Sequence, residues 1–353
     1  MQKIIAKIHL GNIRQNAELL KSHTGKKLCA VVKANAYGHG AEEVVNALES
    51  VADYFAVALI EEGLCIRAPA CGKPILVFTP PLDEEEACAL IDNGFIATVP
   101  DLWTAKLLVR ACQRRKKPLK VHLKVNTGMN RYGMNGSMLG KVCKFLSNES
   151  LVEVEGLYTH LCECTNARAN LQYRLFLKHC LVARRYFPDI ITHLGGTYAA
   201  ICNKNFDVDM FRVGLGLYGY LPDGKYDKTL CSSLQKGMTV YAKAVANHQF
   251  SYGGAGYGKA LTKTKAKDIK YLSVCRFGYA DGFLRQKNNG VCGADLQLNN
   301  LCMDVSIRKG RLRRGKTLPL LLDADETARA TNTISYEVLC AASRRAELIY
   351  DND

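Results

Sequence analysis

No long hydrophobic run, leader-like segment or low-complexity stretch occurs in this sequence. Because about 18 consecutive apolar residues are needed to cross a bilayer, no membrane-spanning helix is predicted. The first ten residues alternate polar with apolar side chains and lack the apolar core and cleavage site of a secretory signal, so we expect a cytoplasmic protein with no membrane partner. With 48% hydrophobic and 23% charged residues, the 353-residue chain has the composition of a soluble globular protein, and its length predicts two domains unless a large barrel is present.

Paired cysteine spacing is also absent. The 15 cysteines are scattered through segments that we expect to be buried, which predicts reduced thiols and no disulfide framework. Cys162 and Cys164 flank Glu163, but no second pair lies near them in the sequence, so we expect no metal site.

Acidic residues are too few to balance the basic ones, and the net charge is +15. Short basic clusters occur at residues 114–117 and 308–316. Such clusters can bind nucleic acid, but no aromatic interleaving or nucleic-acid motif accompanies them. We interpret them as solvated faces and expect no nucleic-acid partner; nucleic-acid binding is the alternative.

What the sequence does contain is a regular alternation of short apolar runs with amphipathic segments. Segments at 12–23, 41–48, 84–91, 102–113, 138–146 and 169–186 have the pattern of helices, with apolar residues recurring at spacings of three and four. Eight strand–helix repeats over about 200 residues predict a (β/α)₈ TIM barrel, in which chemistry is found where the strands end. The eight predicted strands cover residues 28–33, 55–60, 75–79, 95–99, 119–125, 152–159, 191–194 and 211–218.

The pattern changes at about residue 226. Strand-like runs at 238–246, 266–274 and 316–322 are then separated by turn-forming residues. We predict an α/β protein with a barrel domain over residues 10–225, followed by a mostly β C-terminal domain over 226–353 that residues 1–9 join as a strand.

Lys33 ends the first predicted barrel strand. A lysine buried there must be paired, desolvated or used covalently, and a Schiff base with an aldehyde cofactor is one such use; a lysine that reaches solvent is the alternative. The segment Lys33-Ala-Asn-Ala-Tyr-Gly-His-Gly40 is similar to the cofactor-lysine motif of alanine racemases, which are fold-type III pyridoxal-phosphate enzymes. Related decarboxylases share Lys-Ala-Asn but lack the Tyr-Gly-His-Gly continuation.

The resemblance continues, in order, along nearly the whole chain, and it implies pyridoxal 5'-phosphate as cofactor. It implies that Lys33 carries the cofactor and that Tyr37 binds the cofactor phosphate, together with Thr197 and the backbone amides of Gly214 and Leu215. Thr197 ends a segment that resembles the family's His-x-x-Asn-Ser. It keeps a hydroxyl at a predicted helix start, where anions bind well.

Three further barrel residues gain roles by the same resemblance. His160, at the end of the sixth predicted strand, matches the histidine that lies against the cofactor ring. Lys124-Val-Asn-Thr-Gly-Met-Asn-Arg131 looks like the family's Lys-Val-Asp-Thr-Gly-Met-Gly-Arg, so Arg131 would bond the phenolic oxygen of the cofactor and the substrate carboxylate. Lys124 matches a lysine that is often carbamylated. An unmodified lysine paired with a carboxylate is the equal alternative, because Asn126 replaces the family's aspartate.

The resemblance also implies that Arg212, in the eighth predicted strand, faces the pyridine nitrogen of the cofactor. An arginine disfavours protonation of that nitrogen, since two adjacent positive charges repel. The carbanion is then less delocalised and is reprotonated quickly, which suppresses transamination and favours racemisation. Racemisation needs an acid/base group on each face of the substrate. Lys33 serves one face, and Tyr252, in a Ser-Tyr-Gly segment similar to the family's, is the candidate for the other, activated by His160.

Two more segments of the second predicted domain match the family. Phe277-Gly-Tyr-Ala-Asp-Gly282 resembles its Gly-Tyr-Ala-Asp-Gly motif and places Tyr279 at the entrance to the site. Met303 matches a methionine whose amide contacts the substrate carboxylate. In the family, the residues that match Tyr252, Tyr279 and Met303 reach the cofactor of the other subunit. The resemblance therefore implies a homodimer with active sites shared across the interface.

The match fails at two places near the C-terminus. Asn299 and Asn300 replace a Gly-Arg, and Ser343-Arg-Arg345 aligns with the family's Ser-Tyr-Arg. Arg344 keeps a charge for phosphate but does not reproduce a phenolic wall beside a methyl-sized pocket. We predict an L-/D-alanine racemase that supplies D-amino acid for the cell wall. The alternatives are a serine or broad-specificity racemase and, outside this class, a non-catalytic pyridoxal-phosphate-binding barrel.

Overall fold

The computed structural model describes residues 4–163, 166–203, 205–222, 228–257, 268–286, 290–293 and 297–351. These residues form two compact units. One comprises Ile13–Ala36 and Ala41–Gln235, and the other comprises the described parts of Met1–Asn12, Tyr37–Gly40 and Lys236–Asp353. No helix among the described residues is long and apolar enough to cross a membrane.

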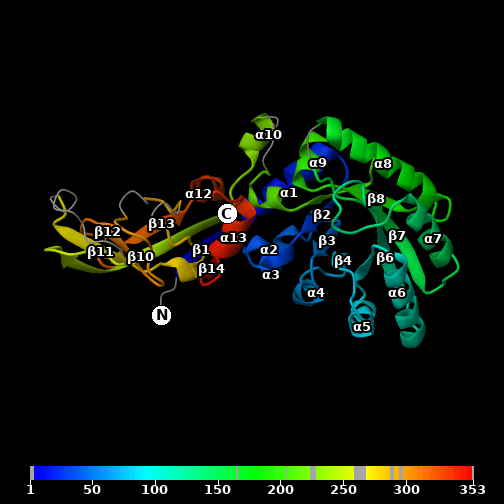
Figure 1. Cartoon of the computed structure of the whole chain (residues 1–353), viewed down its shortest axis with the longest axis horizontal. Helices are drawn as coiled ribbons and strands as arrows, with labels where there is room; N and C mark the ends of the chain where they lie inside the picture. Colours follow the sequence, from blue (N-terminus) through cyan, green and yellow to red (C-terminus); the bar gives the residue numbers. More distant parts are fainter. Residues whose placement is uncertain are drawn as a thin grey trace. The chain divides into compact units, whose positions relative to one another are not determined.

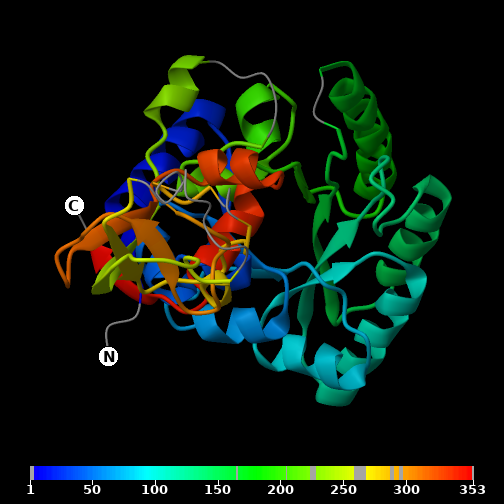
Figure 2. The same cartoon turned by 60° about the vertical axis from the view of Figure 1, so that its left-hand side comes forward.

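Eight parallel strands close into a barrel with helices around its outside, which confirms the predicted fold (Figures 1 and 2). Neighbours in sequence pair in order, and the last strand closes on the first. Most strand residues are buried, because helices cover the outer face and side chains fill the interior, and this burial produces continuous apolar runs. The strands are β2 (Lys27–Val31), β3 (Tyr54–Val57), β4 (Ile75–Val77), β5 (Ile96–Val99), β6 (Leu119–Lys124), β7 (Val152–Tyr158), β8 (Ile191–Leu194) and β9 (Met210–Val213).

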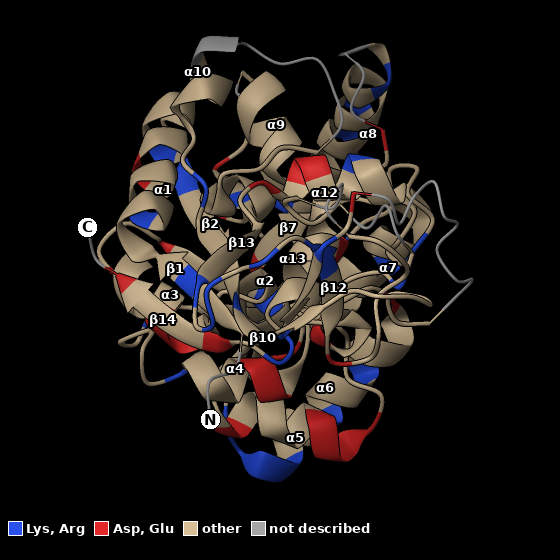
Figure 3. Cartoon of the chain, turned by 90° about the vertical axis from the view of Figure 1, so that its left-hand side faces the viewer, with Lys and Arg blue, Asp and Glu red and all other residues tan. Residues whose placement is uncertain are grey.

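Two helices of the barrel begin at aspartate caps where the chain turns back from the preceding strand. The Asp83 carboxylate accepts the Glu86 N–H at 2.9 Å, and the Asp101 carboxylate accepts the Thr104 N–H at 2.8 Å. Acidic residues gather near α5, whose first turn is Glu84–Glu86 (Figure 3). The helices are α1 (Leu10–Thr24), α3 (Ala41–Leu48), α4 (Ile60–Ile66), α5 (Glu84–Asp92), α6 (Leu102–Arg115), α7 (Gly136–Leu146), α8 (Asn166–Arg184), α9 (Thr197–Cys202) and α10 (Lys228–Ser233).

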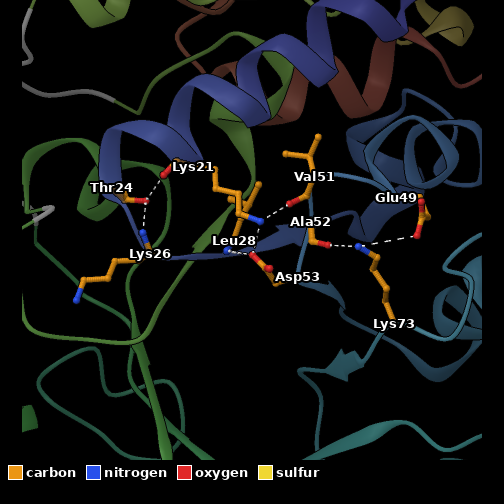
Figure 4. A network of polar contacts seen from close by, with 9 residues as sticks. All are labelled: Lys21, Thr24, Lys26, Leu28, Glu49, Val51, Ala52, Asp53 and Lys73. Atoms are coloured by element: carbon orange, nitrogen blue, oxygen red, sulfur yellow. Dashed lines mark hydrogen bonds and ion pairs between the residues drawn. The ribbon is translucent and has the colours of Figure 1, made fainter.

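A polar network holds the N-terminal ends of β2 and β3 (Figure 4). This face of the barrel is opposite the one where the strands end. Asp53 accepts the Leu28 N–H at 2.7 Å and pairs with Lys21 at 2.9 Å. Lys73 donates to the Ala52 carbonyl at 2.6 Å. Polar contacts at this end of a TIM barrel serve stability rather than chemistry.

The predicted strand 211–218 is wrong in its second half. β9 ends at Val213, and a short 3₁₀ helix, η1, occupies Leu215–Tyr218. Gly214 has ψ −89°, which ends the strand, and Gly219 takes φ +83°, which ends the helix. The predicted strand 28–33 also ends early, at Val31.

The second unit contains a six-stranded sheet in the order β12-β11-β10-β1-β14, with β13 also paired to β10. β1 runs antiparallel to β10 and parallel to β14. The predicted run 266–274 becomes a strand only from Tyr271, and residues 266–267 lie outside the described residues. The strands are β1 (Ile5–His9), β10 (Met238–Gln249), β11 (Tyr271–Cys275), β12 (Ser306–Lys309), β13 (Thr317–Leu321) and β14 (Glu347–Asp351), and the helices are η2 (Tyr279–Asp281), α12 (Ala324–Thr331) and α13 (Ser335–Ala342).

Candidate active site

Lys33 opens a left-handed turn, Lys33–Tyr37, labelled α2 in Figure 1. Residues 34–37 have φ between 52° and 55°, a region that costs a non-glycine residue roughly 1–2 kcal/mol. Two side chains hold this backbone: Glu62 accepts the Ala34 N–H at 2.7 Å, and Asn35 accepts the Ala41 N–H at 2.8 Å. The lysine is therefore presented at the end of β2 by a strained but well-bonded turn.

Four basic side chains lie near His160, which lies two residues beyond β7. Burial and the nearby charges of Arg212, Arg131, Lys124 and Lys33, in that order, lower the pKa of His160 to about 3. His160 is therefore neutral at pH 7. The barrel thus brings together five of the residues predicted from the sequence, which come from the ends of β2, β6, β7 and β9 and from the loop after β6.

Arg212 is buried in the barrel with only 3% of its surface exposed. One guanidinium nitrogen, Nη1, lies 2.9 Å from His193 Nδ1, and the other, Nη2, donates to the Thr159 carbonyl at 2.7 Å and lies 3.4 Å from His160 Nδ1. A guanidinium only donates, so both Nδ1 atoms accept. Each imidazole, being neutral, then carries its proton on Nε2.

Lys124 is also buried, and its ammonium donates to the Val125 carbonyl at 2.6 Å. Burial, with Arg212 and Arg131 nearby, lowers its pKa to about 7. Among the described residues, no salt bridge includes Lys124. Much of this amine is therefore uncharged at neutral pH, in an environment that favours negative charge.

Asn126 shapes the loop that carries Arg131. Its Oδ1 accepts the Gly128 N–H at 3.0 Å and the Asn130 N–H at 3.1 Å. The exposed Arg131 guanidinium lies 5.5 Å from the centre of the Tyr132 ring. The loop is therefore fixed from within by an asparagine where the family has an aspartate.

Thr197 joins two helix starts that are open to an anion. α9 begins at Thr197 after Gly196, and η1 begins at Leu215 after Gly214, neither with a side-chain cap. Thr197 Oγ1 accepts the Gly216 N–H at 2.9 Å, and a Cβ on Gly216 would lie 2.7 Å from the Thr197 methyl group. The glycine thus permits close contact between two sets of amides that suit a phosphate.

Profiles of known families cover almost the whole chain. The alanine racemase N-terminal domain matches residues 8–222, and the alanine racemase C-terminal domain matches residues 237–350. The chain belongs to the alanine racemase family. It is accordingly an isomerase of the amino-acid racemase type, and enzymes of this family use pyridoxal 5'-phosphate.

Individual alanine racemases agree with this assignment. The enzyme of Streptococcus pyogenes serotype M5 is 31% identical over 366 residues, which covers 98% of either chain. That of Lactobacillus delbrueckii subsp. bulgaricus is 32% identical over 371 residues, covering 98% of this chain and 97% of the relative. The solved alanine racemase of Clostridium difficile 630 is 27% identical and covers 99% of this chain and 96% of its own, with a TM-score of 0.89.

The other residues suggested by the resemblance to alanine racemases lie in the second unit. Tyr252 has 88% of its surface exposed, Met303 53% and Tyr279 37%. The Tyr279 N–H donates to the Cys302 carbonyl at 3.1 Å, so their two segments are paired through the backbone. The Tyr37 ring lies 5.7 Å from that of Tyr336 within the same unit.

Arg345 fixes those paired segments, a role that the sequence did not indicate. Its guanidinium lies 2.9 Å from Asp304 and 3.5 Å from Asp281. Only the position of this arginine after Arg344, in a family motif, could have drawn attention to it. The neighbouring Arg344 side chain is exposed.

The 14 cysteines among the described residues are free thiols. No group of three metal-ligating side chains occurs in the part of the chain that the structure describes. Cys164, one of the predicted Cys-x-Cys pair, lies outside it.

Proposed function

We propose that this chain is a pyridoxal-phosphate-dependent alanine racemase that interconverts L- and D-alanine. The observation that carries the proposal is the buried Arg212 within a cluster of basic side chains at the ends of the barrel strands. Such a cluster suits the phenolic oxygen of the cofactor and the carboxylate of an amino acid, two groups that carry negative charge.

The donors of the barrel fit the cofactor. Lys33 would supply the amine for its aldehyde, Thr197 and the amides of Gly214 and Leu215 would hold the phosphate, and Arg212 would interact with the ring nitrogen. Tyr37 completes the phosphate contacts, as the family motif implies. When bound, the cofactor supplies an electron sink that weakens the α-carbon–hydrogen bond of the amino acid.

The protein residues then move one proton. Arg131 orients the substrate carboxylate, together with the backbone amide of Met303 of the partner subunit. The Lys33 amine exchanges a proton with one face of the α-carbon, and the phenol oxygen of Tyr252 of the partner subunit serves the other. His160, neutral and protonated on Nε2, donates to that oxygen and so stabilises its anionic form.

A homodimer with composite sites follows from this assignment. Tyr252, Tyr279 and Met303 are all exposed on their own unit, where they are available to a second copy. We further propose a cytoplasmic enzyme whose D-alanine is used for the cell wall.

Lys124 is proposed to carry a carbamate. Its lowered pKa leaves an uncharged amine that can react with carbon dioxide. The resulting anion would offset the nearby charges of Arg131 and Arg212, whereas a free ammonium would repel both.

Hydrogen exchange in deuterated water tests the function. The purified holoenzyme is given L-alanine or L-serine, and both enantiomers are analysed for α-deuterium. We expect both enantiomers of alanine to carry deuterium, with a higher kcat/KM than for serine. Preference for serine would replace the proposal by its nearest alternative, and bound cofactor without any exchange would indicate a non-catalytic barrel.

A further inference from the structure

A chain of four buried or partly buried side chains crosses the interior of the barrel and ends on Arg212. Glu155 Oε2 lies 3.1 Å from His122 Nε2, His122 Nδ1 lies 2.9 Å from His193 Nε2, and His193 Nδ1 lies 2.9 Å from Arg212 Nη1. The residues come from the consecutive strands β6, β7, β8 and β9. Both histidines are completely buried.

The direction of every hydrogen bond in this chain is fixed by its two ends. Arg212 only donates, so His193 Nδ1 accepts and its proton is on Nε2. His193 therefore donates to His122 Nδ1, and His122, protonated on Nε2, donates to the carboxylate of Glu155. In each of the three hydrogen bonds, the donor is therefore the residue nearer to Arg212 and the acceptor is the residue nearer to Glu155.

The charge states agree with this direction. Burial lowers the pKa of His193 well below its usual value, and burial also lowers that of His122. Burial tends to raise the pKa of Glu155, but hydrogen bonds from His122 and Lys120 outweigh it and lower the value to about 2. Two neutral imidazoles therefore link a carboxylate to a guanidinium.

The backbone of β7 is shaped to make this arrangement possible. Val121 pairs with Val154, whereas His122 pairs with Gly156, so Glu155 is an extra residue in a β-bulge. A bulge re-aims the side chain that it carries. A Cβ on Gly156 would lie 2.6 Å from the His122 ring, so only glycine leaves room for the imidazole at this place.

Neighbouring side chains contact His193 and Glu155. The Tyr158 ring stacks on His193, with centroids 4.9 Å apart and an interplanar angle of 16°. The Tyr54 hydroxyl lies 3.4 Å from Glu155 Oε2. Lys120 pairs with Glu155. It also lies 3.7 Å from the exposed carboxylate of Glu153, two residues earlier in β7.

We propose that Glu155, His122 and His193 act as a relay of fixed polarity that positions Arg212 and thereby sets the choice between racemisation and transamination. The carboxylate polarises both imidazoles, which makes His193 Nδ1 a stronger acceptor for the guanidinium. This deepens the proposed function and rests on it. None of the three relay residues touches substrate or cofactor; each acts through Arg212.

The two outcomes differ in where one proton goes. In racemisation, the proton removed from the α-carbon is replaced on the α-carbon. In transamination, the proton is added to the former aldehyde carbon of the cofactor, the amino group stays on the cofactor, and water releases the keto acid. An Arg212 that is no longer held against the ring nitrogen would favour the second outcome.

The wild-type protein provides the first test, which needs no variant. In ¹⁵N-labelled holoenzyme at neutral pH, we expect two imidazoles with the Nε2–H tautomer whose Nε2 protons exchange slowly with water. The ¹H–¹⁵N correlations of His122→Gln and His193→Gln assign the signals. An imidazolium or an Nδ1–H tautomer at either residue would overturn the relay, whatever reaction the enzyme catalyses.

The second test compares Glu155→Gln with Glu153→Gln, which removes the neighbouring carboxylate but leaves the relay intact. Keto acid formed per racemisation turnover is measured with L-alanine. We expect this ratio to rise several-fold in Glu155→Gln, with KM little changed, and to stay at the wild-type value in Glu153→Gln. Equal ratios in the two variants would refute the proposal.

The two tests separate the relay from the function. If the wild-type holoenzyme racemises nothing, the proposed function fails while the tautomer measurement still decides whether the relay exists. If racemisation is observed but Glu155→Gln keeps the wild-type ratio, the relay alone fails.

Discussion

Asn126 and Asn130 face each other across the loop that follows β6, with Asn126 Nδ2 donating to Asn130 Oδ1 at 2.8 Å. The corresponding family motif has aspartate and glycine at these two positions. Asn130 has φ +56°, a conformation that glycine adopts freely and asparagine tolerates better than most residues. The two asparagines therefore hold this loop through a hydrogen bond to each other.

Replacing Asn126 by alanine removes three hydrogen bonds from the loop that carries Arg131. We expect KM for alanine to rise several-fold with a smaller change in kcat, because carboxylate binding is loosened in ground state and transition state alike. The double variant Asn126→Asp with Asn130→Gly should remain near wild type. Asn170→Ala, on the exposed face of α8, is the control; a KM for Asn126→Ala equal to that of this control would contradict the expectation.

Ala34→Gly should stabilise the protein. Relief of a positive φ stabilises the folded protein by about 1–2 kcal/mol, and the greater freedom of glycine in the unfolded chain offsets about 0.4–1 kcal/mol of this. The net gain is therefore about 0–1.6 kcal/mol, centred near about 0.8 kcal/mol. Ala89→Gly, in helix α5, has no such strain to relieve and should destabilise by a similar amount. Urea unfolding of both variants measures the difference, and a shift of the same sign in both would rule out this account.

Mixing two inactive variants should restore activity if sites are shared between subunits. Lys33→Ala and Tyr252→Phe each remove one acid/base group, but a heterodimer carries one site with both groups intact. After unfolding and refolding a 1:1 mixture, we expect about a quarter of wild-type activity, since half of the dimers are mixed and each has one good site. Absence of any recovery, with mixed dimers present by native mass spectrometry, would exclude composite sites.

A carbamate on Lys124 should be visible by ¹³C NMR. In ¹³C-bicarbonate buffer, we expect a carbamate signal that is lost in Lys124→Met and retained in Lys141→Met, an exposed lysine on α7. A wild-type spectrum without the signal would establish a free amine at this position.

The ion pairs of Glu155 should appear in the pH dependence of stability. Its pKa is about 2 in the folded protein and 4.5 in the unfolded reference. As pH falls below about 4.5, the unfolded chain takes up a proton that the folded protein does not, so this contribution is lost progressively. We expect wild type to lose more stability than Glu155→Gln between about pH 6 and about pH 3.5 in urea titrations, with Glu153→Gln resembling wild type. Parallel curves for wild type and Glu155→Gln would show that Glu155 has no depressed pKa.

The barrel could be predicted from the sequence because its strands are buried on both faces and are spaced regularly by amphipathic helices. Lys33, Arg131, His160 and Arg212 could be found because each lies in, ends or follows such a run and belongs to a family motif. Strand boundaries were harder to predict. The apolar run that begins at Phe211 continues to Tyr218 in the sequence, but the strand ends before Gly214, where the backbone turns. The apolar pattern does not indicate this turn.

The amino-acid order by itself determined the alternation of strands and helices, the strand ends where polar residues collect, and the motif around Lys33, because these depend on neighbours along the chain. Only the tertiary structure decided that Glu155, His122, His193 and Arg212 touch. Contacts between side chains on different strands depend on the register of those strands, and here a single bulged residue in β7 and the absence of a side chain at Gly156 set it.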